Sequence, residues 1–149
     1  MSGDVLQELR DIESIKQVKA RYVRCADTKD WEGFASVLTD DYLFDSEGGV
    51  VQGRDKVVAM VSRSLANAST VHHVFNPEIT FTGPDAAEVV WPMEDYVRMS
   101  LNGQPYAFHG CGHYTETYVR TDDGWRLKVC KLTRLRVDPL DGTTFPTRA

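Results

Sequence analysis

The sequence predicts an α+β fold in which three helices precede a long, curved, mainly antiparallel sheet. Helical periodicity is confined to roughly the first 67 residues, and strand-like segments make up most of the remaining chain. Two turn signals typical of hairpins, Asn102-Gly103 and Asp122-Asp123-Gly124, separate the longest of these segments. Helices first and strands afterwards indicate the α+β class.

The helices are predicted from spacing and from residues that start or stop a helix. Segment 5–27 is the first, because one stripe recurs at spacings of three and four: Val5, Leu9, Ile12, Ile15, Lys19 and Tyr22. Asp30 is expected to cap a second helix that carries Trp31 and Phe34 and ends at 39–41. Gly53 is expected to open a third helix over 54–67.

The strands are predicted from alternation and from turn residues. A short hairpin, 42–45 with 50–52, is expected between the second and third helices. Pro92 predicts a bulge or a sheet edge. The predicted main strands are 70–75, 79–82, 87–99, 106–120 and 125–137. Three helices covering the concave face of such a sheet would leave a cone with one open mouth, a natural pocket for a small apolar molecule.

Length and composition predict one domain over residues 1–137 and a C-terminal tail over 138–149. A net charge of −5 argues against nucleic acid and anionic membranes as partners, since both need clustered basic residues. The first ten residues hold no apolar signal-peptide core, so a cytoplasmic location is expected. Three cysteines without a CxxC pair predict reduced thiols and no zinc site.

Asp27 is the first candidate for chemistry, because it lies at the C-terminal end of the predicted first helix. The helix dipole disfavours an acid there, so another group is expected to hold it. A solvated acid, or a cap for the next helix, explains the position equally well. Tyr22 precedes Asp27 by five residues and is either a second pocket residue or a core aromatic.

The pair His72-His73 lies in a predicted strand, where neighbouring side chains point to opposite faces. One imidazole must therefore face the cone, although alternation alone does not say which. A carboxylate beside the inward histidine would fix its tautomer and make it a general base.

His109 and His113 flank two glycines in another predicted strand, where glycine indicates a bulge or a close approach to a ligand. Their i,i+4 spacing would suit a metal only on a helix, and Glu94 and Asp95 are too few to complete a ligand set. Either histidine is expected to line the pocket, with no metal. The chain has no GxSxG, P-loop or GxGxxG motif, so no cofactor is predicted.

These patterns resemble the SnoaL-like, or NTF2-like, superfamily along nearly the whole chain. The matching stretches are 22–34, Thr70-Val71-His72-His73-Val74-Phe75-Asn76-Pro77 and the final hairpin with Gly124-Trp125. The resemblance is strongest to scytalone dehydratase, bile acid 7α-dehydratase and hexachlorocyclohexane dehydrochlorinase, which remove a proton with an Asp–His dyad. It implies the cone-shaped barrel, a homo-oligomer of two or three copies and a small apolar substrate: a steroid, terpenoid, polyketide or aromatic compound.

The resemblance also assigns roles to individual residues. It selects His72 over His73 as the base, pairs it with Asp27, and places Tyr22 or His109 on the substrate oxygen. It implies substrate-binding positions for a further set: His109, His113, His73, Trp31 and Arg134. This chain differs from these relatives at two pocket positions. Ser46 stands where the scytalone enzyme has a pocket tyrosine, and the pocket arginine of the dehydrochlorinase aligns near Cys130. Halide elimination is therefore not predicted.

The sequence thus predicts a cofactor-independent lyase of the dehydratase or isomerase type. Two other hypotheses remain open. One is a binding or assembly module without catalysis, which a pocket lacking a second polar group near His72 would favour. The other is a cyclase or an enzyme resembling ketosteroid isomerase (a standard example of a strand aspartate acting as base), which would need Asp45 or Asp95 as its base.

Overall fold

A computed structural model describes residues 2–140 and confirms the predicted α+β class. Three helices come first, interrupted by one hairpin: α1 (Ser2–Thr28), α2 (Trp31–Ser36) and α3 (Arg54–Leu65). The strands are β1 (Leu38–Ser46), β2 (Gly49–Gln52), β3 (Ser69–Val74), β4 (Glu78–Gly83), β5 (Ala86–Leu101), β6 (Gln104–Thr121) and β7 (Gly124–Pro139).

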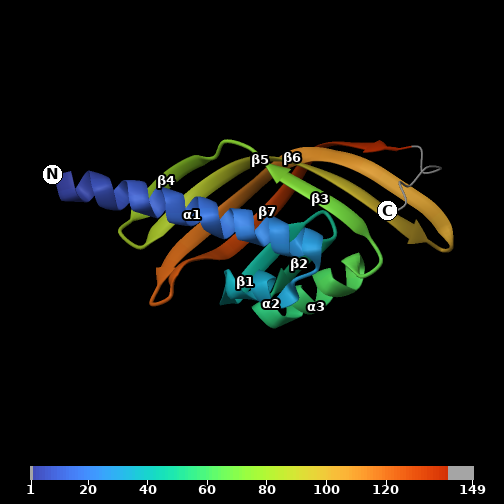
Figure 1. Ribbon diagram of the computed structural model, residues 1–149, viewed down its shortest axis with the longest axis horizontal. Coiled ribbons are helices and arrows are strands. Elements are labelled where there is room, and N and C mark those ends of the chain that lie inside the picture. The colour runs from blue at the N-terminus through green and yellow to red at the C-terminus, as the bar shows by residue number, and fades with distance from the viewer. Residues whose placement is uncertain (1, 141–149) are drawn as a thin grey trace.

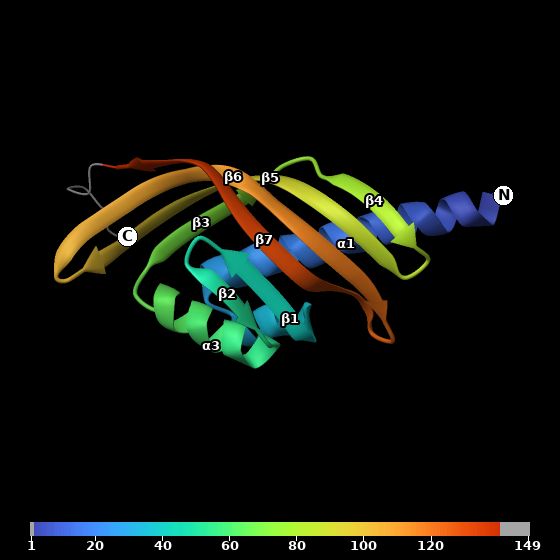
Figure 2. The ribbon, with the colours of Figure 1, turned by 180° about the vertical axis from the view of Figure 1, so that it is seen from behind.

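One twisted sheet contains all seven strands, in the order β2-β1-β7-β6-β5-β3, and β4 also pairs with β5. Every pairing is antiparallel except that of β1 with β7, which is parallel. Figures 1 and 2 show the long strands arching over one layer that holds α1 and α3. Within residues 2–140, the sheet therefore has a concave face covered by helices and an outer face that no helix covers.

Helix α1 begins three residues before its predicted start, and only part of its predicted stripe is buried. Ile15 and Tyr22 lie in the core, whereas Val5 and Leu9 are more than half exposed. The N-terminal end of α1 projects beyond the sheet, which leaves these two side chains largely exposed (Figure 1). Lys19, also predicted in the stripe, is fully buried and forms an ion pair with Glu116 of β6.

The second helix begins as predicted, because the Asp30 carboxylate accepts a hydrogen bond from the Gly33 amide at 2.9 Å. Its predicted end at 39–41 is wrong. The helix stops at Ser36, and β1 begins at Leu38 because its backbone joins the sheet. Leu38 pairs in register with Leu127 of β7, and the Leu127 amide donates to the Val37 carbonyl at 2.9 Å. Sheet hydrogen bonds and burial of Leu38 thus outweigh helical spacing.

Pro92 lies where the outer neighbour of β5 changes from β3 to β4. The pairing with β3 reaches Met93, and the pairing with β4 starts at Val90. The sheet tolerates the missing amide proton of Pro92 at this position. The Pro92 carbonyl accepts a hydrogen bond from the Phe75 amide at 2.9 Å. The predicted interruption is therefore a local gap in the sheet, and β5 pairs with β6 through Pro92 without a bulge.

Strand β7 continues to Pro139, two residues past the predicted domain end, and the Leu140 amide bonds to the Ala107 carbonyl. Most of the predicted tail, residues 141–149, lies outside the described residues. Within residues 2–140, no helix is both long and apolar enough to cross a membrane.

Asp11 anchors the middle of α1 to the sheet. Its carboxylate accepts two hydrogen bonds from Arg120 of β6, at 2.9 and 2.7 Å, and one from the Trp125 indole at 2.9 Å. The bonds from Arg120 are the main reason that the pKa of Asp11 lies below its ordinary value, even though burial opposes this shift.

We predict that Asp11→Asn lowers the free energy of unfolding by about 1–3 kcal/mol at neutral pH, the usual cost of losing hydrogen bonds to a charged group. Folding lowers the pKa of Asp11, so the ionised carboxylate stabilises the folded state. This stabilisation is complete at pH values above the ordinary carboxyl pKa and is lost as the pH falls through the lowered pKa. Urea unfolding between pH 7 and pH 3 tests this. Glu8→Gln, at an exposed position one turn away, is the control; an equal loss at both positions would contradict the assignment.

Candidate active site

A cavity of about 320 Å³ lies between the helices and the concave face of the sheet. Most of its lining is apolar, from α1, α3 and the inner positions of β5, β6 and β7. The apolar residues are Val23, Ala26, Phe34, Phe44, Met60, Val61, Leu65, Val97, Met99, Phe108 and Leu132. Seven polar or aromatic polar side chains complete the lining: Tyr22, Ser46, Ser64, His72, Asp95, Tyr114 and Arg134. Such a cavity suits a small apolar molecule with a few oxygen atoms.

Asp27, one residue before the end of α1, is held by three hydrogen bonds from β3. The His72 ring nitrogen Nδ1 lies 2.6 Å from Oδ1, the His72 amide donates to Oδ2 at 2.8 Å, and the Thr70 hydroxyl donates to Oδ1 at 2.8 Å. Burial raises the pKa of Asp27, but the hydrogen bonds from His72 and Thr70 outweigh burial, so the net pKa is lowered. These bonds are what hold an acid at the unfavourable end of the helix dipole.

Alternation along β3 settles which histidine faces inward. His72 lines the cavity with 14% of its side chain exposed, whereas His73 points outward with 54% exposed. An ionised carboxylate only accepts hydrogen bonds, so Nδ1 of His72 carries the proton that is shared with Asp27. The neutral ring therefore presents an unprotonated Nε2, which lies 3.9 Å from Asp95 Oδ2.

Asp95 and Arg134 form a second polar pair in the cavity wall. The guanidinium donates to both carboxylate oxygens, at 2.8 and 2.7 Å, and the Asp95 side chain is 3% exposed. Gly110 makes room for this pair, because a Cβ there would lie 2.0 Å from Arg134 Nη1 and 2.4 Å from Asp95 Oδ1. The close approach predicted from the glycines is thus to this ion pair at Gly110.

Two tyrosines, Tyr22 and Tyr114, line the cavity. Burial raises the pKa of both Tyr22 and Tyr114 well above the ordinary phenol value, so both are protonated at neutral pH and able to donate hydrogen bonds. The Tyr22 and Tyr42 hydroxyls are 3.4 Å apart. Behind them, the Lys19 ammonium lies 3.6 Å from the Tyr114 ring centroid and 4.3 Å from that of Tyr22. The Lys19–Glu116 pair therefore supports both rings from the core side.

Four predicted substrate-binding residues are not placed in the cavity. His73, His109 and His113 lie on the outer face of the sheet, since their positions in β3 and β6 alternate with those that line the cavity. Trp31 packs edge-on against Phe34 at 5.9 Å between ring centroids and does not line the cavity. Of the other four, Tyr22, His72 and Arg134 line the cavity, and Asp27 contacts His72.

Sequence reasoning missed Tyr114 and gave Asp95 only an alternative role as base. The feature that points to Asp95 is strand register, because Asp95 in β5 lies directly opposite His72 in β3. The signal for Tyr114 was spacing, because it lies four residues after the glycine that accommodates Arg134 and therefore on the same face of β6.

We predict that Arg134→Met lowers the free energy of unfolding by about 3 kcal/mol, because it leaves the Asp95 charge buried and unpaired. The double variant Asp95→Asn with Arg134→Met recovers much of this loss. A double-mutant cycle by urea unfolding measures the coupling. Arg136→Met is the matched control, since the Arg136 side chain is 65% exposed and its removal costs about 0–1 kcal/mol. Additive losses at Asp95 and Arg134 would contradict a coupled pair.

The cavity is thus lined by a histidine bonded to Asp27, by an arginine and by two tyrosines, within a mainly apolar wall. Comparison with known proteins gives the family. The model of the SnoaL-like domain matches residues 7–131, and the chain belongs to this family. The chain is also 24% identical over 133 residues to FGR4 of Gibberella zeae, which is named a probable cyclase; the match covers 81% of this chain and 89% of that protein.

Solved structures show the same fold. A type 2 hexachlorocyclohexane dehydrochlorinase (LinA) superposes with a TM-score of 0.85 at 20% identity, covering 95% of this chain and 97% of that one. A scytalone dehydratase-like protein from Novosphingobium aromaticivorans superposes with a TM-score of 0.78 at 22% identity, covering 100% and 99%. The fold predicted from the resemblance, an NTF2-like cone, is confirmed.

Proposed function

We propose that the protein is a cofactor-independent lyase of the dehydratase or isomerase type, in which His72 removes a proton from carbon. The observation that carries this proposal is the contact of Asp27 with His72 Nδ1 at 2.6 Å, in a histidine that lines the cavity. This contact leaves Nε2 as the free base. It also places a carboxylate against the imidazolium that proton transfer creates.

The proposed step begins when His72 Nε2 takes a proton from a carbon next to a carbonyl group. The C–H electron pair moves toward the carbonyl oxygen, which Tyr22 stabilises by donating a hydrogen bond. In a dehydration, this electron pair then forms the C=C bond. The hydroxyl group leaves with the C–O pair and takes the proton from imidazolium, which regenerates neutral His72. In an isomerisation, the same proton returns to a different carbon of the substrate.

Arg134 is the second group proposed to contact the substrate oxygen. Its guanidinium has five N–H donors, and the two bonds to Asp95 leave others available toward the cavity. Asp95 balances the charge of Arg134, so the cavity gains hydrogen-bond donors without an unpaired cation. This pair is also the second polar group near His72 that a purely binding module would lack.

The size of the cavity narrows the substrate class. A volume of about 320 Å³ lies at the small end of ligand cavities, which span roughly 300–1,000 Å³. The apolar lining favours a ring system with one or two oxygen atoms. Among the expected classes, a one- or two-ring aromatic, polyketide or terpenoid compound therefore fits better than a steroid.

The alternative with a strand aspartate as base finds less support. Both carboxylate oxygens of Asp95 accept hydrogen bonds from Arg134, so Asp95 has no free, basic oxygen comparable to His72 Nε2. Asp45 does not line the cavity. Proton abstraction by His72 is accordingly the mechanism that the geometry favours.

We predict that His72→Ala and Asp27→Asn each lower proton abstraction by about 10²–10⁴-fold, the usual contribution of general-base catalysis. Because the chemistry starts with removal of a proton, exchange in D₂O of protons next to the carbonyl of one- and two-ring β-hydroxy ketones measures it by NMR before any product is known.

His113→Ala is the matched control and keeps full exchange, since His113 lies on the outer face. Exchange that proceeds at the wild-type rate in His72→Ala would refute the mechanism. Tight binding of such ketones without any exchange would instead identify a binding module.

The expected homo-oligomer of two or three copies is also a proposal. Support comes from the projecting end of α1, where Val5, Leu6 and Leu9 are each more than half exposed. We predict that light scattering gives a mass of two or three chains and that the double variant Leu6→Glu with Leu9→Glu lowers it. Ser14→Glu, at an exposed site on the same helix, is the control. A monomeric wild-type protein would contradict this expectation.

A further inference from the structure

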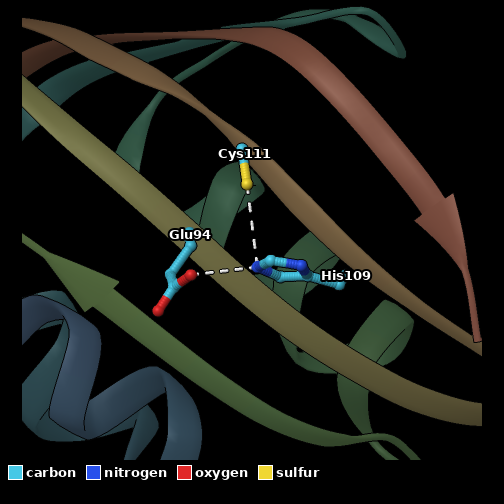
Figure 3. Close-up of side chains that lie close together, drawn as sticks. All are labelled: Glu94, His109 and Cys111. Carbon is cyan, nitrogen blue, oxygen red and sulfur yellow. Dashed lines mark hydrogen bonds and ion pairs between the residues drawn. The ribbon is translucent and has the colours of Figure 1, made fainter.

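A second cluster of chemically active side chains lies on the outer face of the sheet. Glu94 comes from β5, and His109 and Cys111 come from β6, two residues apart and therefore on one face. His109 Nε2 lies 2.9 Å from Glu94 Oε2 and 3.6 Å from Cys111 Sγ, and the three ligand atoms all lie within 4.8 Å of one another. Figure 3 shows the three side chains converging above the two strands.

Two neighbours fix the orientation of these side chains. The Tyr96 ring stacks on the His109 ring, with 4.3 Å between centroids and 6° between planes, and so directs Nε2 toward Glu94 and Cys111. His73, directly opposite Glu94 in β3, lies with Nδ1 3.2 Å from Oε1, which leaves Oε2 on the side of His109. Supporting contacts of this kind are typical of metal ligands, whose partners set their direction.

The donor set fits a particular kind of cation. Imidazole nitrogen, thiolate sulfur and carboxylate oxygen are the three ligand types that zinc takes in proteins, at about 2.0–2.3 Å. Ligand atoms on one tetrahedral ion are then about 3.2–3.8 Å apart. The His109–Cys111 distance of 3.6 Å already lies in this range, and the Glu94–His109 distance of 2.9 Å needs an opening of a few tenths of an ångström.

Local charge is compatible with a dication. The nearest cationic residue in register is Arg136, opposite Cys111 on β7, and the Asp138 carboxylate lies 2.7 Å from its Nε atom. The side chains of Glu94 and His109 are 25% and 19% exposed, so an ion can reach them from solvent.

We propose that Glu94, His109 and Cys111 form a site for a zinc-type divalent cation, with His73 positioning Glu94. Binding releases the thiol proton of Cys111 and any proton on His109 Nε2 to solvent, and the metal accepts one lone pair from each ligand. The fourth position faces solvent and takes water. This differs from the expectation of no metal, because that expectation weighed His109 and His113 with Glu94 and Asp95 and did not include Cys111, two residues from His109 in β6.

Cobalt(II) titration of the reduced, full-length protein tests the proposal, because a thiolate ligand gives a strong near-ultraviolet charge-transfer band. We expect one equivalent of cobalt to bind, and zinc to displace it, since zinc binds such sites more tightly. Cys25 and Cys130 are buried in the core, so the band reports Cys111. Cys111→Ser abolishes the band, and His73→Ala weakens metal affinity by about 10–100-fold, as expected for a positioning residue.

His113→Ala is the matched control, since His113 lies on the same strand and face outside the cluster; it keeps the band and the affinity. Zinc also raises the melting temperature of the wild-type protein but not that of Cys111→Ser, a readout that needs no activity. No band with excess cobalt, or a band that survives Cys111→Ser, would overturn the proposal. Asp27→Asn keeps the metal site, so failure of the proposed enzyme function would not affect this result.

Discussion

The hydrogen bonds on the Asp27 carboxylate join the first helix to the sheet, and the geometry of the site depends on them. Three donors from β3 surround this group: the Thr70 hydroxyl, the His72 amide and the His72 ring. The backbone donor fixes where β3 lies relative to α1. The ring donor fixes which nitrogen of His72 faces the cavity. One partly buried carboxylate therefore sets both the packing of helix on strand and the protonation pattern of the proposed base.

Two ion pairs also lie behind the cavity wall: Lys19–Glu116, which is fully buried, and Asp95–Arg134, which is largely buried. Charges taken out of water are stable only when their partners and hydrogen bonds are complete. Each pair meets this condition, because Tyr118 donates to Glu116 and Arg134 contacts both oxygens of Asp95. The pairs support the phenol and guanidinium groups around the cavity in fixed positions. This rigidity is what oriented proton transfer requires.

Alternation along the strands separates two kinds of chemistry. Asp95 and Glu94 are neighbours in sequence, yet Asp95 faces the cavity and Glu94 faces outward toward His109 and Cys111. The same holds for His72 and His73. The acid–base site and the proposed cation site thus lie on opposite faces of the same strands, and each can be altered by substitution without direct contact with the other.

The sequence by itself determined the class of fold, the order of the elements and the turn at Asn102-Gly103, because these depend on local periodicity and on residues that tolerate positive φ. It also indicated Asp27, since an acid at a helix C-terminus needs a partner. The resemblance selected His72 over His73, which alternation alone left open. Only the tertiary structure decided the partner of Arg134 and the outward direction of His109 and His113. Those facts depend on sheet register and on which strands are neighbours, and residues distant in sequence fix both.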